Sequence, residues 1–271
     1  MSHDGFLGLA QRHPTHAKVG GLVGLLVGDA LGVPYEFHSA QQLPARKAIE
    51  MQPPTGFPRA HSGVPIGTWS DDGAHALCLL ASLVEQRRFS LVDFADRLLR
   101  WLDRGYLAVD GKVFDVGIQT ADALDNLRDG VSPRESGGAE VMDNGNGSLM
   151  RCLPLALLHR GTDSELVREA HLQSLPTHAH PRSWIACAFY CLVATGYLQG
   201  LADPWASADG RLEEVEAGVR VPKRRDLAER ILAAQRIARV VGVSGFDGDL
   251  RLETEHACGD AYLAAKRRGG G

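Results

Sequence analysis

The chain has 271 residues, which is enough for one large domain or two small ones and for a sizeable buried core. Hydrophobic residues make up 44% of it and charged residues 23%, the usual balance of a soluble globular protein. The formal net charge of -4 gives no reason to expect nucleic acid or an anionic membrane as a partner. An anionic ligand would therefore have to be bound by local features.

The cysteines and the N-terminal residues favour a reducing compartment. The five cysteines are odd in number, lie mostly in apolar stretches and form no CxxC pair, which argues against a disulfide framework and a zinc knuckle. No basic region leads into a long apolar run at the start, so we expect no secretory signal. The apolar residues 19–33 are about half a membrane span and include Asp29, which would be costly in lipid. We expect a soluble, cytoplasmic monomer.

Apolar residues recur at steps of three and four along the chain, which predicts helices. The first of two clear examples begins after Ser70, and the second is preceded by the capping-box pair Ser90 and Asp93 and ends before Gly105. The predicted core face of the first helix is Ala74, Leu77, Leu80, Ala81 and Val84, and that of the second is Phe94, Leu98, Trp101 and Leu102.

Further helices are predicted over residues 164–175, 183–200 and 226–242, whereas no segment of useful length alternates with period two. The sequence therefore predicts an all-α protein, a compact multi-helix bundle in one domain over residues 1–265. Residues 266–271 form a charged, flexible tail. The segments 53–65 and 134–147 are long loops rich in glycine, and loops of this length in a compact domain are usually functional or disordered.

The first candidate motif lies in residues 20–36. Gly20, Gly24 and Gly28 follow one another at four-residue steps, which predicts a helix face that another backbone approaches closely. Each glycine costs about 1 kcal/mol relative to alanine, so three in one helix need a compensating reason. Asp29 falls near the C-terminal end of this helix, where the helix dipole disfavours an anion. Asp29 and Glu36 are therefore functional candidates, or else exposed carboxylates at a fraying helix end.

The second motif opens the helix at Ser70. The hydroxyl of Ser70 and the adjacent carboxylates of Asp71 and Asp72 supply the hard oxygen ligands that Mg²⁺ prefers. The same three residues also suit the first turn of a helix, where they cap free N–H groups and complement the dipole. The spacing alone leaves both interpretations open.

Three later motifs offer weaker signals. Asp115 precedes a helix with Ala123, Leu124 and Leu127, and is either a general base or a cap. A glycine-rich turn over residues 144–148 leads towards an apolar helix and could bind phosphate through backbone N–H groups, although ordinary turns look the same. His178 and His180 are two residues apart in a loop, which favours ligand-contacting or capping roles over a metal pair.

Together these motifs resemble the ADP-ribosylglycohydrolase family. In chain order they read GDALGVPYEF, GTWSDDGAHAL, FDVGIQTADAL, GNGSLMRCLPLALL and THAHP, between Gly20 and about Gly200. The family includes dinitrogenase-reductase-activating glycohydrolase and the ADP-ribosylarginine and ADP-ribosylserine hydrolases. The resemblance implies an all-helical fold with two Mg²⁺ ions at the base of an ADP-ribose cleft.

The resemblance also implies a role for individual residues. Ser70, Asp71 and Asp72 would ligate metal, although Gly73 stands where the family usually has Thr or Ser. Asp29 and Glu36 would lie near the scissile bond, with Glu36 in a mobile segment that closes over it, and Asp115 would assist proton transfer. The residues implied to contact the phosphates, the distal ribose or the ligand are Gly145, Asn146, Gly147, Ser148 and His178.

The late part of the sequence departs from the family pattern. The family closes its metal site with an Asp-x-Asp-Thr/Ser motif. The residues around Asp247 and Asp249, and those around Asp260, do not match this motif. We therefore expect a C-terminally shortened domain that holds at most one Mg²⁺ ion weakly. The activity expected is magnesium-dependent hydrolysis of the bond between C1 of the ribose and a protein side chain or small molecule. The alternatives are a catalytically impaired module that binds ADP-ribose and a structural relative with an empty cleft.

Overall fold

A computed structural model of the chain describes residues 14–218, and regular structure in this range is helical. The α-helices are α2 (Pro14–Gly32), α3 (Asp71–Gln86), α4 (Leu91–Arg104), α5 (Ile118–Arg128), α6 (Leu153–Leu158), α7 (Asp163–Ser174), α8 (Pro181–Gln199) and α9 (Pro204–Gly218). Short 3-10 helices, η1 (Val33–Tyr35), η2 (Arg46–Ala48) and η3 (Val109–Gly111), interrupt the loops. An isolated parallel bridge joins Gly138 and His178. The predicted all-α class is confirmed.

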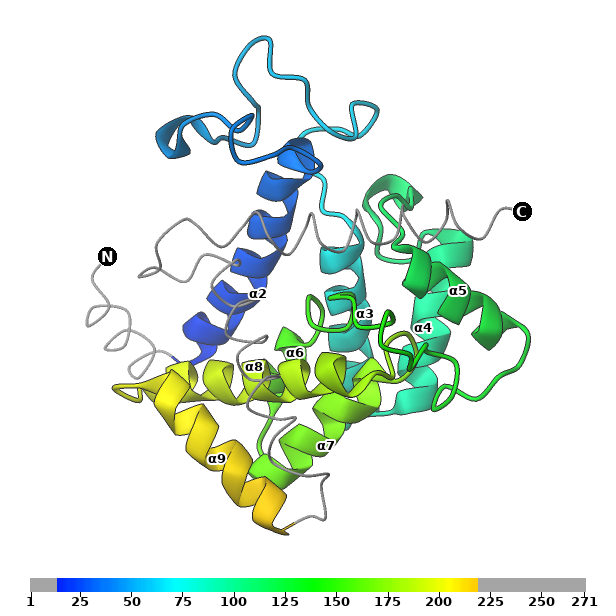
Figure 1. The fold of residues 1–271 in the computed structure, drawn as a ribbon, viewed down its shortest axis with the longest axis vertical. Helices are drawn as coiled ribbons and strands as arrows, with labels where there is room; N and C mark the ends of the chain where they lie inside the picture. Colours follow the sequence, from blue (N-terminus) through cyan, green and yellow to red (C-terminus); the bar gives the residue numbers. More distant parts are fainter. Residues whose placement is uncertain (1–13, 219–271) are drawn as a thin grey trace.

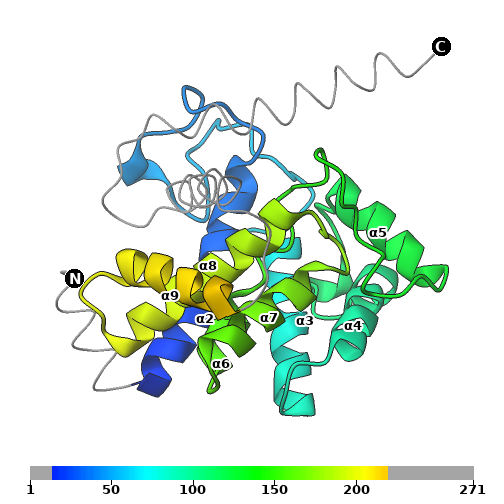
Figure 2. The same cartoon turned by 60° about the horizontal axis from the view of Figure 1, so that its bottom comes forward.

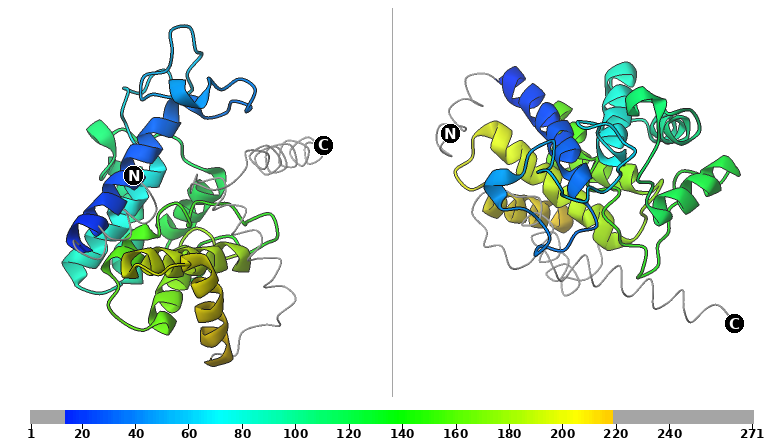
Figure 3. Two further views of the ribbon diagram at one scale, coloured as in Figure 1. Left: turned by 90° about the vertical axis from the view of Figure 1, so that its left-hand side faces the viewer. Right: turned by 90° about the horizontal axis from the view of Figure 1, so that it is seen from above.

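Helix α8 organises the packing. It contacts α2, α6, α7 and α9, while α3 contacts α2, α4 and α6 (Figure 1). Seen from a second direction, α8 lies between α9 and the α3–α4 pair, with α5 at the far end of the helical body (Figure 2). The long connection between α2 and α3 lies beyond the C-terminal end of α2, outside this body (Figure 3).

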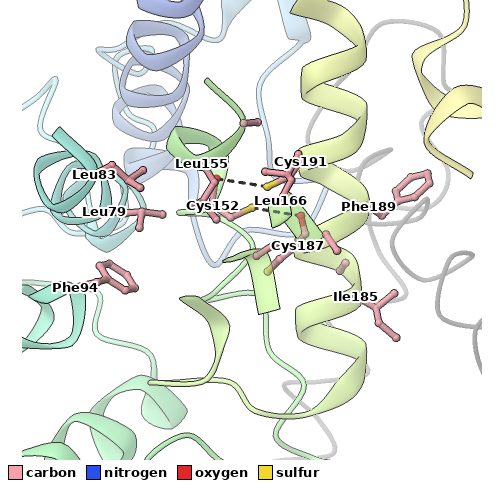
Figure 4. Close-up of a cluster of buried hydrophobic side chains, with 14 of the residues drawn as sticks. Leu79, Leu83, Phe94, Cys152, Leu155, Leu166, Ile185, Cys187, Phe189 and Cys191 are labelled. Atoms are coloured by element: carbon pink, nitrogen blue, oxygen red, sulfur yellow. Dashed lines mark hydrogen bonds between the residues drawn. The ribbon is translucent and has the colours of Figure 1, made fainter. Parts of the chain in front are cut away.

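The core forms where α3, α4, α6, α7 and α8 meet (Figure 4). Helix α8 is apolar on most of its surface because it is covered on several sides. The thiols of Cys191 and Cys152 donate to the carbonyl oxygens of Cys152 and Cys187, which fastens α8 to the start of α6. Four cysteines, Cys78, Cys152, Cys187 and Cys191, are buried and free, as expected from their apolar context, and Cys258 lies outside the described residues.

The prediction for α4 is confirmed in its extent and wrong in one detail. Phe94, Leu98 and Trp101 are buried, and the helix ends at Gly105, which has the left-handed backbone of a C-cap. The Ser90 hydroxyl accepts the backbone N–H of Asp93, as in a capping box. The Asp93 carboxylate, however, accepts from the Arg97 guanidinium and so does not complete the box. A complete capping box stands instead at the start of α7, between Thr162 and Glu165.

The predicted core face of α3 is partly wrong. Ala74 is buried, but Val84 is 59% exposed, and the remaining buried apolar positions are Ala76, Cys78, Leu79 and Leu83. Helix α3 contacts α2, α4 and α6 over a wide arc, so a stripe drawn at strict steps of three and four misses part of it. Helix α9 was not expected from the sequence. The predicted helix at 226–242, the tail at 266–271 and the candidates Asp247, Asp249 and Asp260 lie outside the described residues.

Helix α2 differs from its sequence-based description in two ways. Among the described residues, no atom lies within 4 Å of a Cβ built at Gly20, Gly24 or Gly28, so the predicted close approach on that face does not occur there. The segment Thr15–Tyr35 spans 21 residues at a mean hydropathy of 1.4, which is longer than the half span expected. Its length and composition alone would allow it to cross a membrane, but core helices of soluble proteins pass the same test. That is weak support for a membrane span.

The close approach of α2 occurs at Gly73 of α3 instead. A Cβ built at Gly73 would lie 2.8 Å from Trp69 Cβ and 2.9 Å from both Asp29 Oδ2 and Leu26 Cδ2. Real Cβ atoms do not come this close, and two of the three atoms belong to α2. The missing side chain at Gly73 therefore sets the distance between the end of α2 and the start of α3.

We expect Gly73→Ala to lower the free energy of unfolding by about 1–3 kcal/mol, because the added methyl group overpacks a rigid contact between two helices. The measurement is chemical denaturation. The matched control is Gly210→Ala, which places the same methyl group in helix α9, where no described atom lies within 4 Å. This control should gain about 0.5–1 kcal/mol from helix propensity. Equal effects of the two substitutions would contradict the close-contact interpretation.

Candidate active site

The site begins where the end of α2 meets the start of α3. The two helices run in opposite directions, so Asp29 near the end of α2 faces the first residues of α3 (Figure 1). Asp29 Oδ2 accepts the backbone N–H groups of Ser70 at 2.9 Å and Gly73 at 2.7 Å, and Oδ1 accepts the Ser70 hydroxyl at 2.8 Å. Burial raises the pKa of Asp29, although these hydrogen bonds oppose the shift. Asp29 thus fixes the N-terminal turn of α3.

That turn carries the proposed metal ligands. Ser70 is the N-cap of α3 and its hydroxyl accepts the N–H of Asp72, so the capping interpretation is confirmed for this residue. Ser70 and Asp71 are buried and Asp72 is half-buried. Burial raises the pKa of Asp71 well above its usual range, with a further contribution from the neighbouring Asp72. Burial and the charge of Asp29 raise the pKa of Asp72 to about 7.

The second part of the site comes from the connection that follows α2. Glu36 directly follows η1, and His61 lies in the glycine- and proline-rich loop. The His61 Nε2 atom is 2.7 Å from Glu36 Oε2. Asp115, from the loop before α5, lies 3.7 Å from the same nitrogen through its Oδ1. Burial, and then the charges of Asp115, Asp72 and Asp29, raise the pKa of Glu36 to about 8. The cluster therefore joins three segments that are far apart in the sequence.

The charge in this cluster is unbalanced. Its five carboxyl groups are Asp29, Glu36, Asp71, Asp72 and Asp115. Within residues 14–218, no lysine or arginine forms an ion pair with any of them. His61 contacts Glu36 and Asp115, and the buried Arg151 interacts with Asp71 only at longer range. Each carboxyl raises the pKa of its neighbours because like charges repel in a poorly solvated space. Such a site favours protons or a cation.

The backbone around His61 is strained. Phe37, His61 and Asp115 have φ angles of 59°, 46° and 55°, in the left-handed region that non-glycine residues rarely adopt. Each such residue costs on the order of 1–3 kcal/mol, and residues of this kind concentrate at functional sites. The strain therefore supports a functional role for the cluster.

Glu36, His61 and Asp115 also offer one donor atom each within 4.8 Å of one another, which is close enough to hold a metal ion. This set of one nitrogen and two oxygen donors differs from the all-oxygen set at the start of α3. Magnesium favours oxygen donors, whereas zinc and related metals accept the mixed set. Two neighbouring groups of ligands of different chemistry thus share this end of the molecule.

The glycine-rich turn lies over a buried histidine. A Cβ at Gly147 would be 2.6 Å from His178 Cε1, and one at Gly145 would be 3.2 Å from His178 Nε2. The His178 ring is buried, its Nδ1 is 2.8 Å from the Thr177 hydroxyl, and burial lowers its pKa to about 3. His178 is thus a neutral support beneath the turn.

The exposure of the turn differs along its length. Gly145 and Asn146 are exposed. The Ser148 hydroxyl is fully buried and accepts from Ser174. The turn is followed by a further turn before α6 begins at Leu153, so it does not lead directly into the helix.

Two residues of this site were missed in the sequence. His61 belongs to no motif, and the only signal for it was the length of the loop that contains it. Gln119, in the first turn of α5, donates to the carbonyl oxygen of Asp143 at 2.7 Å and accepts the N–H of Gly145 at 3.3 Å. It lies within the FDVGIQTADAL motif, four residues after Asp115, and so ties the glycine-rich turn to the segment that carries Asp115.

The comparisons with known proteins agree with this geometry. The family model for ADP-ribosylglycohydrolase matches residues 13–266. ADP-ribosylarginine hydrolase Tri1 of Serratia proteamaculans is 30% identical over 182 residues, which cover 67% of this chain and 47% of the relative. The Tri1 protein of Pseudomonas putida is 35% identical over 160 residues, covering 59% and 40%. The ADP-ribosyl-[dinitrogen reductase] glycohydrolase of Rhodospirillum rubrum is 30% identical over 171 residues, covering 62% and 53%.

The fold is also that of a solved relative. A structure described as an ADP-ribosylglycohydrolase-related protein complex superposes with a TM-score of 0.57 at 25% identity, covering 86% of this chain and 69% of that chain. The chain spans about half the length of the curated relatives it matches. The family model, however, covers most of the chain, and the motifs that carry the resemblance meet in one site. The chain belongs to the ADP-ribosylglycohydrolase family.

Proposed function

We propose that this chain hydrolyses the bond between C1 of the ribose of ADP-ribose and a modified side chain, with Mg²⁺ as cofactor. The observation that carries the proposal is the meeting of Glu36, Asp72 and Asp115 from three distant segments in one poorly neutralised cluster. Family membership supports hydrolysis of ADP-ribose linkages. Because two of the most similar relatives are named ADP-ribosylarginine hydrolases, arginine is the first attachment to test.

The residues at the start of α3 fit magnesium. Ser70, Asp71 and Asp72 offer hard oxygen atoms, and the raised pKa values of the two aspartates reflect repulsion and burial that a divalent cation would relieve. Mg²⁺ held by these residues would supply an oriented, more acidic water and help to orient the substrate. Asp29 holds the turn in place through its hydrogen bonds to Ser70 and Gly73, so its contribution is to position the ligands.

The remaining carboxyl groups would act as proton donor and proton acceptor. A water oxygen bonds to C1 as the bond from C1 to the side-chain nitrogen or oxygen breaks, through an oxocarbenium-like transition state. Glu36, whose pKa burial and the neighbouring carboxyl charges raise to about 8 in the metal-free protein, is the group that would give a proton to the leaving group. Asp115 can accept the proton of the attacking water. The exposed residues Gly145 and Asn146 offer backbone N–H groups for the phosphates.

A pocket of about 340 Å³ lies between residues 63–68 and 109–114, which precede Ser70 and Asp115 in the sequence. None of the five carboxyl groups lines it, and its lining combines Val64, Pro65 and Phe114 with the charged residues Asp110 and Lys112. Its apolar part could receive the aliphatic portion of an extended side chain. We also propose a cytoplasmic location, since the free buried cysteines suit a reducing compartment.

We expect Asp72→Asn to lower the rate of release of ADP-ribose from an ADP-ribosylated arginine peptide by about 100-fold or more, since it removes a charged metal ligand. Omission of Mg²⁺ should give a similar loss. The matched control is Asp96→Asn on the exposed side of α4, which should leave the rate unchanged. The measurement is steady-state hydrolysis with and without Mg²⁺.

Two results would contradict the proposal. If the wild type binds ADP-ribose in calorimetry but releases none from arginine or serine peptides, the chain is a binding module. If Asp72→Asn is as active as Asp96→Asn, the ligands of the catalytic ion lie elsewhere, and Asp247, Asp249 and Asp260 should be substituted next.

We expect the metal-free protein to become less stable as the pH rises from about 6.5 to 8.5. The pKa values of Glu36 and Asp72 rise from their usual 4.5 and 3.8 to about 8 and about 7, so the folded state binds more protons than the unfolded state. Stability is therefore lost as these protons leave. The lowered pKa values of His75 and His178 act only below about pH 6.5, where unfolded histidine titrates, so they do not mask the effect.

The measurement is the melting temperature in EDTA and in excess Mg²⁺ across this range. Magnesium should flatten the pH dependence, and Asp72→Asn should reduce it in EDTA. A melting temperature that rises between pH 6.5 and 8.5 in EDTA would show that the carboxyl cluster is not protonated in the folded state.

A further inference from the structure

His61 occupies the centre of the cluster although no motif predicts it. Its Nε2 atom is 2.7 Å from Glu36 Oε2 and 3.7 Å from Asp115 Oδ1, so one nitrogen faces both carboxyl groups. Glu36 and Asp115 come from different loops, and the charge of Asp115 contributes to the raised pKa of Glu36. The His61 imidazole lies between the two carboxyl groups and links their positions.

The imidazole has two aromatic neighbours. The ring of Phe114 meets it edge-on with centroids 5.1 Å apart, and the ring of Phe37, a residue that is 82% exposed, lies 5.4 Å away in a tilted arrangement. Phe37 follows Glu36 and Phe114 precedes Asp115, so each carboxyl-bearing residue also brings an aromatic neighbour to the histidine. The His61 side chain is 17% exposed.

The backbone is strained at three positions of the cluster. His61 has a φ angle of 46°, and its two neighbours in the cluster, Phe37 and Asp115, also have positive φ angles. Strain of this kind is enriched at functional sites and is consistent with a role for His61 there. The connection that carries His61 lies beyond the C-terminal end of α2, outside the helical body (Figure 3).

We propose that His61 is a positioning residue, which holds the Glu36 carboxyl against Asp115 and thereby sets the geometry in which Glu36 acts. This inference rests on the proposed function. His61 acts through Glu36 and need not touch the substrate, because its Nε2 atom is already engaged by the two carboxyl groups. Without it, Glu36 would lose the 2.7 Å contact that fixes the position of its carboxyl group, while the first turn of α3 and the glycine-rich turn remain intact.

The test compares the full-length wild type with His61→Ala, His61→Gln, Glu36→Gln and the double variant Glu36→Gln/His61→Ala. Hydrolysis of an ADP-ribosylated arginine peptide gives kcat and KM, and calorimetry gives the Kd for ADP-ribose. The control is Gln42→Ala, which removes two hydrogen bonds that Ser39 donates to Gln42 in the same connection but leaves the cluster untouched.

The expected result is a loss of about 10- to 100-fold in kcat for His61→Ala, with the Kd for ADP-ribose changed by less than about threefold. His61→Gln keeps one N–H donor and should recover to within about fivefold of the wild type. In the Glu36→Gln background, His61→Ala should cost nothing further, because the two residues act as one unit. Gln42→Ala should behave as the wild type.

Three results would overturn the inference. The first is an unchanged kcat in His61→Ala, and the second is a further loss in the Glu36→Gln background. The third is a parallel loss of ADP-ribose affinity and rate in both His61→Ala and Gln42→Ala, which would mean that the loop has only a structural role. A wild type that does not hydrolyse the peptide would instead refute the proposed function, and the inference with it.

Discussion

The Asp29 carboxylate is the contact on which the site depends. It accepts two backbone N–H groups and a hydroxyl from the first turn of α3 and so acts as a cap supplied by another helix. This arrangement requires the two helices to approach closely, which the absence of a side chain at Gly73 permits. The direction of Asp71 and Asp72 then follows from the position of the helix start. A carboxylate at the unfavourable end of α2 is stabilised by the favourable end of α3.

The carboxyl cluster that depends on this contact lowers the stability of the protein when no ligand is bound. Several carboxyl groups share a poorly solvated space, and their raised pKa values indicate that the site disfavours their charged forms. The packing of α3, α6 and α8 elsewhere offsets that cost. A cation or a substrate that relieves the repulsion gains binding energy at the place where the chemistry would occur. The repulsion that destabilises the cluster in the free protein is therefore the same repulsion that would favour binding of a cation or substrate.

The sequence predicted the parts of the molecule that obey local rules. The ends of α4 and α8 follow from capping residues and from Gly105 and Gly200. The family motifs named Asp72 and Asp115 as candidates, and the structure brings both close to Glu36. Contacts between residues distant in the sequence could not be predicted. Nothing local shows that α2 and α3 approach closely at Gly73 and that the glycine stripe on α2 stays open within residues 14–218.

The same limit applies to His61. It is recognisable only when the loop that carries it is folded back on Glu36. A role that depends on the three-dimensional path of a loop leaves no periodic or spaced pattern in the residues themselves.

The packing of His178 beneath the glycine-rich turn has a consequence for how such sequences diverge. The imidazole fills the space that a side chain at position 147 would need, so the two positions cannot vary independently. A relative with a larger residue at the position of Gly147 should carry a smaller one at that of His178, or a rebuilt turn. The pair thus links two motifs that lie 31 positions apart, and sequence drift in one is restrained by the other.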